Sequence, residues 1–258
     1  MTRRPDSIVE AMDNSDSGRR MPIPTEREIR ERFAHVGYTA MHARRFGYTV
    51  ERVAALKLPA RPRVIDIGPS PLTTLLTECL GVPVDTLGLD SLGFAASASR
   101  HYEFDLNDSQ YEEKWIAVEE PYDLVVMGEI IEHMHTSPAR VLAFVRSLLV
   151  PGGLLLLGTP NGVALGRRIH ILAGRNPFHL INEDPTDPLH FREYTQREMD
   201  AYIEGVGFEV VNSQMVSLLD SRGRTGKNRL IGNVQNRVYR HLPPSLRDSL
   251  LVVARRKG

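Results

Sequence analysis

The run Glu129-Ile130-Ile131-Glu132-His133 holds the residue types best suited to chemistry. Two carboxylates and an imidazole form a mixed oxygen and nitrogen donor set, which suits Mg²⁺, Mn²⁺ or Fe²⁺ better than structural zinc. If the chain turns helical after Gly128, all three side chains share one face, because they are three and four positions apart. His190 is the expected fourth ligand. The sequence therefore predicts a divalent-metal site formed by Glu129, Glu132, His133 and His190.

The same side chains also suit chemistry without a metal. A hydroxyl is a poor nucleophile at neutral pH, and His133, His135 or His190 could act as its general base. With or without a metal, we expect Glu132, His133 and His190 to be the catalytic residues. A third interpretation gives Glu129 a contact with a cofactor and the other side chains structural roles. The residues themselves leave these three interpretations open.

A second group of residues follows the apolar run Val64-Ile65-Asp66-Ile67. A dinucleotide-binding turn needs three spaced glycines, but only Gly68 is present, and Ser70 and Thr73 occupy the other two places. A ligand without a pyrophosphate therefore fits this turn better than NAD. Asp90 comes 22 residues after Gly68, where a carboxylate can accept both hydroxyls of a ribose. The turn at Gly68 and the carboxylate of Asp90 together predict a ligand that contains a nucleoside but no pyrophosphate.

These motifs, in this order, resemble those of class I S-adenosylmethionine-dependent methyltransferases. The resemblance covers roughly residues 60–215. It rests on Val64-Ile65-Asp66-Ile67-Gly68, Leu87-Gly88-Leu89-Asp90, Phe104-Asp105-Leu106-Asn107, the run from Tyr122 to Glu129, Leu149-Val150-Pro151-Gly152-Gly153 and Thr159-Pro160-Asn161.

The resemblance implies S-adenosylmethionine as cofactor. Asp66 and Gly68 would face its methionine part, Asp90 its ribose and Asp105 its adenine amino group, and Leu106 would donate its backbone N–H to the adenine ring. Ser70, Ser91 and Glu129 complete the expected cofactor-binding set. Ser70 and Leu72 depart from the family's glycine-rich turn and predict a stiffer loop.

The E-x-x-E-H run with a later histidine resembles particular branches of this superfamily. These are the ubiquinone-biosynthesis O-methyltransferases, the metal-dependent small-RNA 2′-O-methyltransferases, and several sugar and glycan O-methyltransferases. The resemblance implies methyl transfer to a hydroxyl of a small-molecule or sugar acceptor, assisted by Mg²⁺ or Mn²⁺.

The elements that must position these residues alternate along the chain. Apolar runs predict strands at 63–67, 84–89, 102–104, 122–127, 154–157, 208–211 and 249–254. Ser70-Pro71, Ser137-Pro138 and the capping box Thr195–Glu198 each predict a helix start. We therefore expect an α/β fold, a Rossmann-like, doubly wound, mostly parallel seven-stranded sheet with helices on both faces.

The sequence also predicts a division of the chain. Residues 1–24 are expected to be a disordered tail, 25–60 an N-terminal helical cap that breaks near Gly37, and 61–258 the methyltransferase domain. Within that domain, the long segment 162–189 is the expected acceptor lid. In the cap, Tyr38, His42, Arg45 and Tyr48 recur at helical spacing. They are expected to form a packing face, and the alternative is that they line the acceptor pocket.

Composition excludes several other classes of protein. The formal net charge is zero, which argues against a general nucleic-acid binder. No apolar run suffices to span a bilayer, and the N-terminus lacks the apolar stretch of a signal peptide. Cys79 is the single cysteine, so no internal disulfide can form, and we expect a cytoplasmic protein with a buried thiol. Neither the oligomeric state nor the exact acceptor is predicted.

Two other functions compete with a hydroxyl methyltransferase. One is an RNA 2′-O-methyltransferase, for which six basic and no acidic residues between Arg222 and Arg240 would be an anion-binding stretch. The other is a methyltransferase fold that binds without catalysis, which the acidic residues Asp66, Asp90 and Asp105 disfavour.

Overall fold

A computed structural model describes residues 21–90, 93–178, 180, 189–218 and 241–258 of the 258-residue chain. Ser91, the basic stretch 222–240 and most of the tail 1–24 lie outside the described residues. The described helices are α1 (Glu26–Arg32), α2 (Gly37–Ala54), α3 (Pro71–Leu80), α4 (Pro138–Ser147), α5 (Leu165–Leu172) and α6 (Gln196–Gly205). Short 3-10 turns are η1 (Ala95–Ser97), η2 (Leu106–Gln110), η3 (Glu112–Lys114), η4 (Ile131–His133) and η6 (Pro244–Leu246).

The strands form one sheet. They are β1 (Val64–Ile67), β2 (Val84–Leu87), β3 (His101–Tyr102), β4 (Tyr122–Gly128), β5 (Leu149–Pro160), β6 (Phe208–Val216) and β7 (Ser249–Arg256). Within the described residues, seven strands pair in the order β3-β2-β1-β4-β5-β7-β6. Only β7 runs antiparallel to its neighbours β5 and β6. The predicted mostly parallel, seven-stranded Rossmann-like sheet is confirmed.

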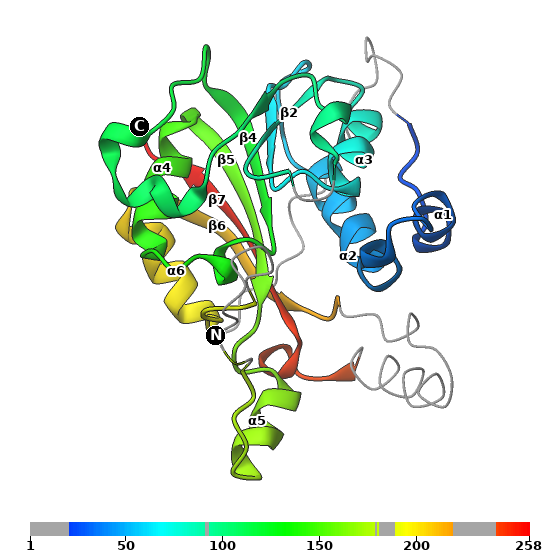
Figure 1. Cartoon of the computed structure of the whole chain (residues 1–258), viewed down its shortest axis with the longest axis vertical. Coiled ribbons are helices and arrows are strands. Elements are labelled where there is room, and N and C mark those ends of the chain that lie inside the picture. Colours follow the sequence, from blue (N-terminus) through cyan, green and yellow to red (C-terminus); the bar gives the residue numbers. More distant parts are fainter. Residues whose placement is uncertain (1–20, 91–92, 179, 181–188, 219–240) are drawn as a thin grey trace, which may run out of the picture.

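Helices cover both faces of the sheet, with α4 and α6 on one side and α2 and α3 on the other (Figure 1). Successive side chains of a strand point to opposite faces. Accordingly, Ile65 and Ile67 of β1 pack with the α4 and α6 layer, whereas Val64 packs with the α2 and α3 layer. Asp66 shares this second face, so its carboxyl group enters a layer that is otherwise largely apolar.

Local capping signals set several element boundaries as predicted. Ser70 caps α3 and Pro71 is its first residue, while Thr195 and Glu198 form the capping box of α6. Thr25 caps α1 in the same way, and α2 begins at Gly37, where the break was expected. Cys79 is buried, as predicted.

Several strands differ from their predicted extents, and β6 runs on to Val216 rather than ending at 211. β2 ends at Leu87 rather than at Leu89, because Gly88 has a φ of 129° and turns the chain out of the strand. β5 begins at Leu149 and continues beyond the apolar run to Pro160, so its last residues lie beside the end of β4. Among the described residues, no helix is both long and apolar enough to cross a bilayer.

Candidate active site

A pocket of about 360 Å³ lies at the carboxyl ends of β1, β4 and β5, the edge where open parallel sheets bind ligands. Its walls come from the turns after β1 and β4, from helix α2, and from β5 and β7. Among the predicted site residues, Asp66, Gly68, Ser70, Glu129 and His133 line it. Residues that are predicted to face the methionine part of the cofactor therefore line the same cavity as one predicted catalytic residue.

A larger cavity of about 440 Å³ lies at the opposite, amino ends of the strands. Its polar lining includes Asp85 and Tyr122, whose hydroxyl donates to Asp85 at 2.8 Å. The smaller pocket is the candidate active site, because the predicted chemical groups converge there and because ligands bind at the carboxyl edge in this architecture.

The turn after β1 is built around Gly68. This glycine has a φ of 86°, and its N–H donates to the Leu87 carbonyl at 2.8 Å, which ties the turn to the end of β2. A side chain at this position would strike Ile130, whose Cδ1 atom would lie 2.5 Å from the added Cβ. The positive φ therefore favours glycine, and a Cβ at this position would also displace the end of the Ile130 side chain.

Asp66 is the buried acid of this turn, with 1% of its surface exposed. The Thr73 hydroxyl donates to its carboxylate at 2.7 Å. Burial nevertheless dominates and raises the pKa of Asp66 to about 7. A cationic group that entered the pocket would favour the ionised carboxylate, so Asp66 is suited to bind the ammonium group of an amino-acid ligand.

The predicted ribose and adenine residues lie beyond the pocket lining, after β2 and β3. Asp90 accepts hydrogen bonds from the Phe94 N–H at 2.8 Å and the Ala95 N–H at 3.0 Å, so it also shapes its own loop. Asp105 is exposed and caps η2 through the Asn107 N–H at 2.9 Å, and Leu106 is buried. Ser91 lies outside the described residues. The cofactor contacts of these residues stay predictions.

Glu129 adopts an unusual backbone conformation. Its φ of 56° is the only positive value at a non-glycine residue among those described, and its N–H donates to the Gly158 carbonyl at 2.8 Å. A side chain in this region is strained, and such strain persists where the surroundings impose it. The 3-10 turn begins only at Ile131, so the expected shared helical face of Glu129, Glu132 and His133 does not form.

Arg45 of α2 is the partner of Glu129. Its guanidinium lies 3.1 Å from the Glu129 carboxylate, and both side chains are nearly buried. Burial raises the pKa of Glu129, and the charge of Arg45 partly opposes that shift. The expected packing face on α2 thus includes a cation in the pocket wall. Helical spacing placed Arg45 on a common face but did not show which acid it meets.

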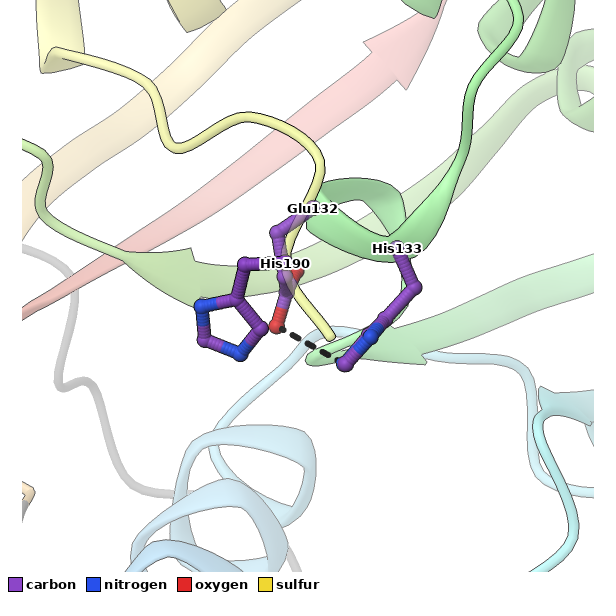
Figure 2. A group of neighbouring side chains, drawn as sticks. All are labelled: Glu132, His133 and His190. Atoms are coloured by element: carbon purple, nitrogen blue, oxygen red, sulfur yellow. Dashed lines mark ion pairs between the residues drawn. The ribbon is translucent and has the colours of Figure 1, made fainter. Parts of the chain in front are cut away.

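Glu132, His133 and His190 form a compact group (Figure 2). One ligand atom from each lies within 4.8 Å of the others. The His133 Nε2 atom is 3.9 Å from Glu132 Oε1, and the two imidazole rings meet edge to face at 4.8 Å between centroids. The structure therefore unites three of the four predicted metal ligands, while Glu129 lies outside this group beside Arg45.

The Glu132 carboxylate is fully buried. Its Oε2 atom accepts a hydrogen bond from the Thr159 hydroxyl at 2.9 Å, but its Oε1 atom has no hydrogen-bond partner within the described part of the chain. Burial, reinforced by the nearby Glu129 charge, raises the pKa of Glu132 well above its usual value. Burial of a carboxylate oxygen without a hydrogen bond is unfavourable, and a bound proton or a cation would stabilise it.

The backbone of Glu132 holds the loop that carries His190. The Glu132 carbonyl accepts hydrogen bonds from the Phe191 N–H at 2.8 Å and the Arg192 N–H at 3.2 Å. Beyond them, Tyr194 pairs with Asn161 at the end of β5 in a parallel bridge. The two bonds to the Glu132 carbonyl join residues 59 and 60 positions apart in the sequence, and they explain how His190 reaches the turn after β4.

Glu193 and Arg167 complete this region, and sequence reasoning missed both. Glu193 Oε1 lies 2.7 Å from His190 Nδ1, and the Arg167 guanidinium of α5 bonds to the same carboxylate. The spacing of His190 and Glu193 is a signal that could have been read in the sequence. No local signal points to Arg167, because it lies 26 residues before Glu193.

The arrangement can support group transfer to a ligand that lies beside the turn after β1. His133 lines the pocket together with Asp66 and Gly68. The same histidine belongs to the group with Glu132 and His190. A hydroxyl in the pocket could therefore meet an imidazole on one side and a bound cofactor on the other.

Comparison with known proteins agrees with this geometry. Residues 41–213 match a protein family described as a methyltransferase domain. An 88-residue stretch, 34% of this chain, is 35% identical to a probable S-adenosylmethionine-dependent methyltransferase of Mycolicibacterium smegmatis, and it spans 29% of that relative's length.

Solved structures share the fold. A methyltransferase from Archaeoglobus fulgidus superposes with a TM-score of 0.53 at 17% identity, covering 83% of this chain and 94% of its own. A Mesorhizobium loti methyltransferase gives 0.53 at 16% identity, covering 82% and 98%. Since the family match includes more than half of the chain, the protein belongs to the methyltransferase-domain family, within the class I S-adenosylmethionine-dependent methyltransferases.

Proposed function

We propose that this protein transfers a methyl group from S-adenosylmethionine to a hydroxyl of a small-molecule or sugar acceptor, with Mg²⁺ or Mn²⁺ held by Glu132, His133 and His190. The family match supports the methyl donor. The observation that carries the finer assignment is the buried Glu132 Oε1, which has no hydrogen-bond partner among the described residues and lies 3.9 Å from His133 Nε2, in the group that also contains His190.

The donor set fits a hard divalent cation. Glu132 offers a carboxylate oxygen and each histidine a ring nitrogen. Because Nδ1 of His190 bonds to Glu193, Nε2 is the nitrogen suited to a ligand role. A bound cation would supply Lewis acidity that makes a neighbouring hydroxyl easier to deprotonate.

The other residues position the reactants. Asp66 would hold the ammonium group of the cofactor, and Gly68 lets the backbone approach it closely. His133 lies where it can orient the acceptor or take its proton. In-line transfer then depends mainly on how the acceptor oxygen faces the sulfonium methyl group.

The segment 162–189 stays a predicted lid over the acceptor. Residues 179 and 181–188 of it lie outside the described residues. Hydrogen exchange with and without product cofactor and acceptor tests this prediction, because closure of a lid should slow exchange in this segment.

The test of the proposed function is methyl transfer to a panel of sugars, catechols and RNA, before and after removal of metal by EDTA. We expect transfer to a hydroxyl acceptor that is lost with EDTA and restored by Mg²⁺ or Mn²⁺. His133→Ala should abolish transfer while cofactor affinity, measured by calorimetry, stays nearly unchanged. Full activity in excess chelator would contradict the metal and favour a histidine base. Transfer to RNA alone would contradict the proposed acceptor.

A further inference from the structure

Five large apolar side chains are exposed on one short segment, which we call the apolar tip: Ile169, Ile171, Leu172, Phe178 and Leu180. The described residues include eleven exposed large hydrophobic side chains, so nearly half of them lie here. Leu172 is 87% exposed and Leu180 83%. Helix α5, which carries the first three, extends away from the body of the protein (Figure 1).

The tip is an ordered element. At the end of α5, Gly174 takes a φ of 69°, and the Arg175 N–H donates to the His170 carbonyl at 2.8 Å. Arg167 donates to the Pro177 carbonyl at 3.0 Å, and its guanidinium lies 5.4 Å from the centre of the Phe178 ring. The backbone is thus held by local bonds while the aliphatic side chains are exposed.

The charge of this segment has one sign. From Asn161 to Asn182 the sequence contains three arginines, two histidines and no acidic residue. Arg168 and Arg175 are exposed among the apolar side chains. An amphipathic helix with basic and aliphatic side chains is suited to the interface of a bilayer that contains anionic lipids. A symmetric contact with a second copy would instead bring like charges together.

The base of the tip is connected to the active site. Arg167 bonds to Glu193, and Glu193 bonds to His190. Arg168 anchors the same helix by donating to the Val163 carbonyl at 2.7 Å and the Ser245 carbonyl at 3.1 Å. A surface bound by the tip would therefore be held at the carboxyl edge of the sheet, the edge that contains the pocket.

We propose that the apolar tip docks on the surface of a lipid bilayer that contains anionic lipids. The aliphatic side chains enter the interface, and Arg175 lies near the headgroup phosphates. This proposal concerns an interaction surface and does not depend on the proposed metal or on the acceptor.

Flotation of the full-length protein with vesicles tests the proposal. The vesicles consist of phosphatidylcholine, with or without phosphatidylglycerol. We expect the parent protein to float with the anionic vesicles and less with the neutral ones. The double variant Ile169→Ser, Leu172→Ser should lose roughly tenfold or more in binding, because two aliphatic chains no longer enter the interface. Arg175→Glu should weaken binding to the anionic vesicles selectively.

A matched control removes two exposed apolar side chains elsewhere. Met21 and Ile23 are 54% and 41% exposed, and the double variant Met21→Ser, Ile23→Ser should bind vesicles like the parent. Equal flotation of the tip variant and the parent would overturn the proposal, as would a parent that binds neither vesicle. A lower melting temperature of the tip variant would show that the chain itself covers the tip. If the parent sediments as a dimer and the tip variant as a monomer, a second copy of the chain covers the tip. Either of these two results contradicts membrane docking.

Discussion

His190 Nδ1 lies 2.7 Å from Glu193 Oε1, three residues further along the chain. Glu193 is almost completely buried and is also bonded to Arg167. An ionised carboxylate accepts the Nδ1 proton, which fixes the ring orientation and leaves Nε2 as the ligand or basic nitrogen. Glu193 is therefore a positioning residue for His190.

The first prediction follows from this pair. Glu193→Gln keeps the size of the side chain but removes the charge that orients His190, so kcat for methyl transfer should fall by about 10–100-fold. Cofactor affinity should stay unchanged, because Glu193 lies outside the pocket lining. Steady-state kinetics and calorimetry measure the two effects. Glu204→Gln, an exposed substitution on α6, serves as the control. An unchanged kcat in Glu193→Gln would remove the positioning role.

The sequence predicted the fold well where the determining signals are local. Ser70-Pro71 and the Thr195–Glu198 box are caps whose hydrogen bonds join residues two or three positions apart, so they can be recognised without tertiary structure. The strand Leu154–Leu157 is apolar throughout because both its faces are buried. Alternation of such strands with capped helices was sufficient to predict the sheet.

The site was predicted less completely because tertiary contacts determine it. The i, i+3, i+4 spacing of Glu129, Glu132 and His133 suggested a helix, but the backbone of Glu129 is held in a left-handed conformation beside β5. Arg45 meets Glu129 only because α2 packs against that edge of the sheet. Arg167 contacts Glu193 across 26 residues of sequence. No short sequence pattern predicts a contact between residues so far apart.

A second prediction concerns the pH dependence of stability. Burial raises the pKa of Asp66 to about 7 in the folded protein, against about 3.9 in an unfolded chain. Between these values the folded state holds more protons than the unfolded state, so the contribution of Asp66 to stability is lost as the pH rises through 7. Asp66→Asn lacks this titration. We compare the free energies of unfolding of the variant and the parent, measured with urea. The difference, variant minus parent, should increase from pH 4 to pH 7 and stay constant above pH 7. A constant difference would contradict the raised pKa.

Cofactor binding should show the opposite dependence. The ionised Asp66 carboxylate favours the ammonium group of S-adenosylmethionine, so affinity should increase as the pH rises through 7. Calorimetry at several pH values measures this, and Asp66→Asn should bind weakly and with little dependence on pH. Thr73→Val, which removes the hydroxyl that donates to Asp66, should move the rise in affinity to higher pH. Equal pH profiles for parent and Asp66→Asn would place the ammonium group elsewhere.

A third prediction concerns Gly68 and Ile130. Gly68→Ala should lower stability by more than the roughly 1–2 kcal/mol of left-handed strain, because the new Cβ lies 2.5 Å from Ile130 Cδ1. Gly93→Ala is the matched control, since Gly93 has a φ of 72° but open space around its Cβ position. Adding Ile130→Val removes Cδ1 and should restore part of the loss. Urea unfolding measures all four variants, with Ile130→Val alone as the fourth, and equal losses in the two alanine variants would contradict the steric argument.

The last prediction isolates metal binding from catalysis. If a cation binds beside Glu132 Oε1, then Mn²⁺ at a hundred times its dissociation constant should stabilise the protein by about 2.7 kcal/mol and raise its melting temperature by about 5–10 °C. Glu132→Gln keeps an acceptor for the Thr159 hydroxyl but removes the charge, so it should abolish this increase. Without metal, the variant should unfold near the temperature of the parent, because burial disfavours the ionised form of Glu132 in the parent. His170→Ala replaces an exposed histidine of α5 and should retain the full increase. An equal increase in Glu132→Gln would place the cation elsewhere, and no increase in the parent at millimolar Mn²⁺ would leave His133 as the general base.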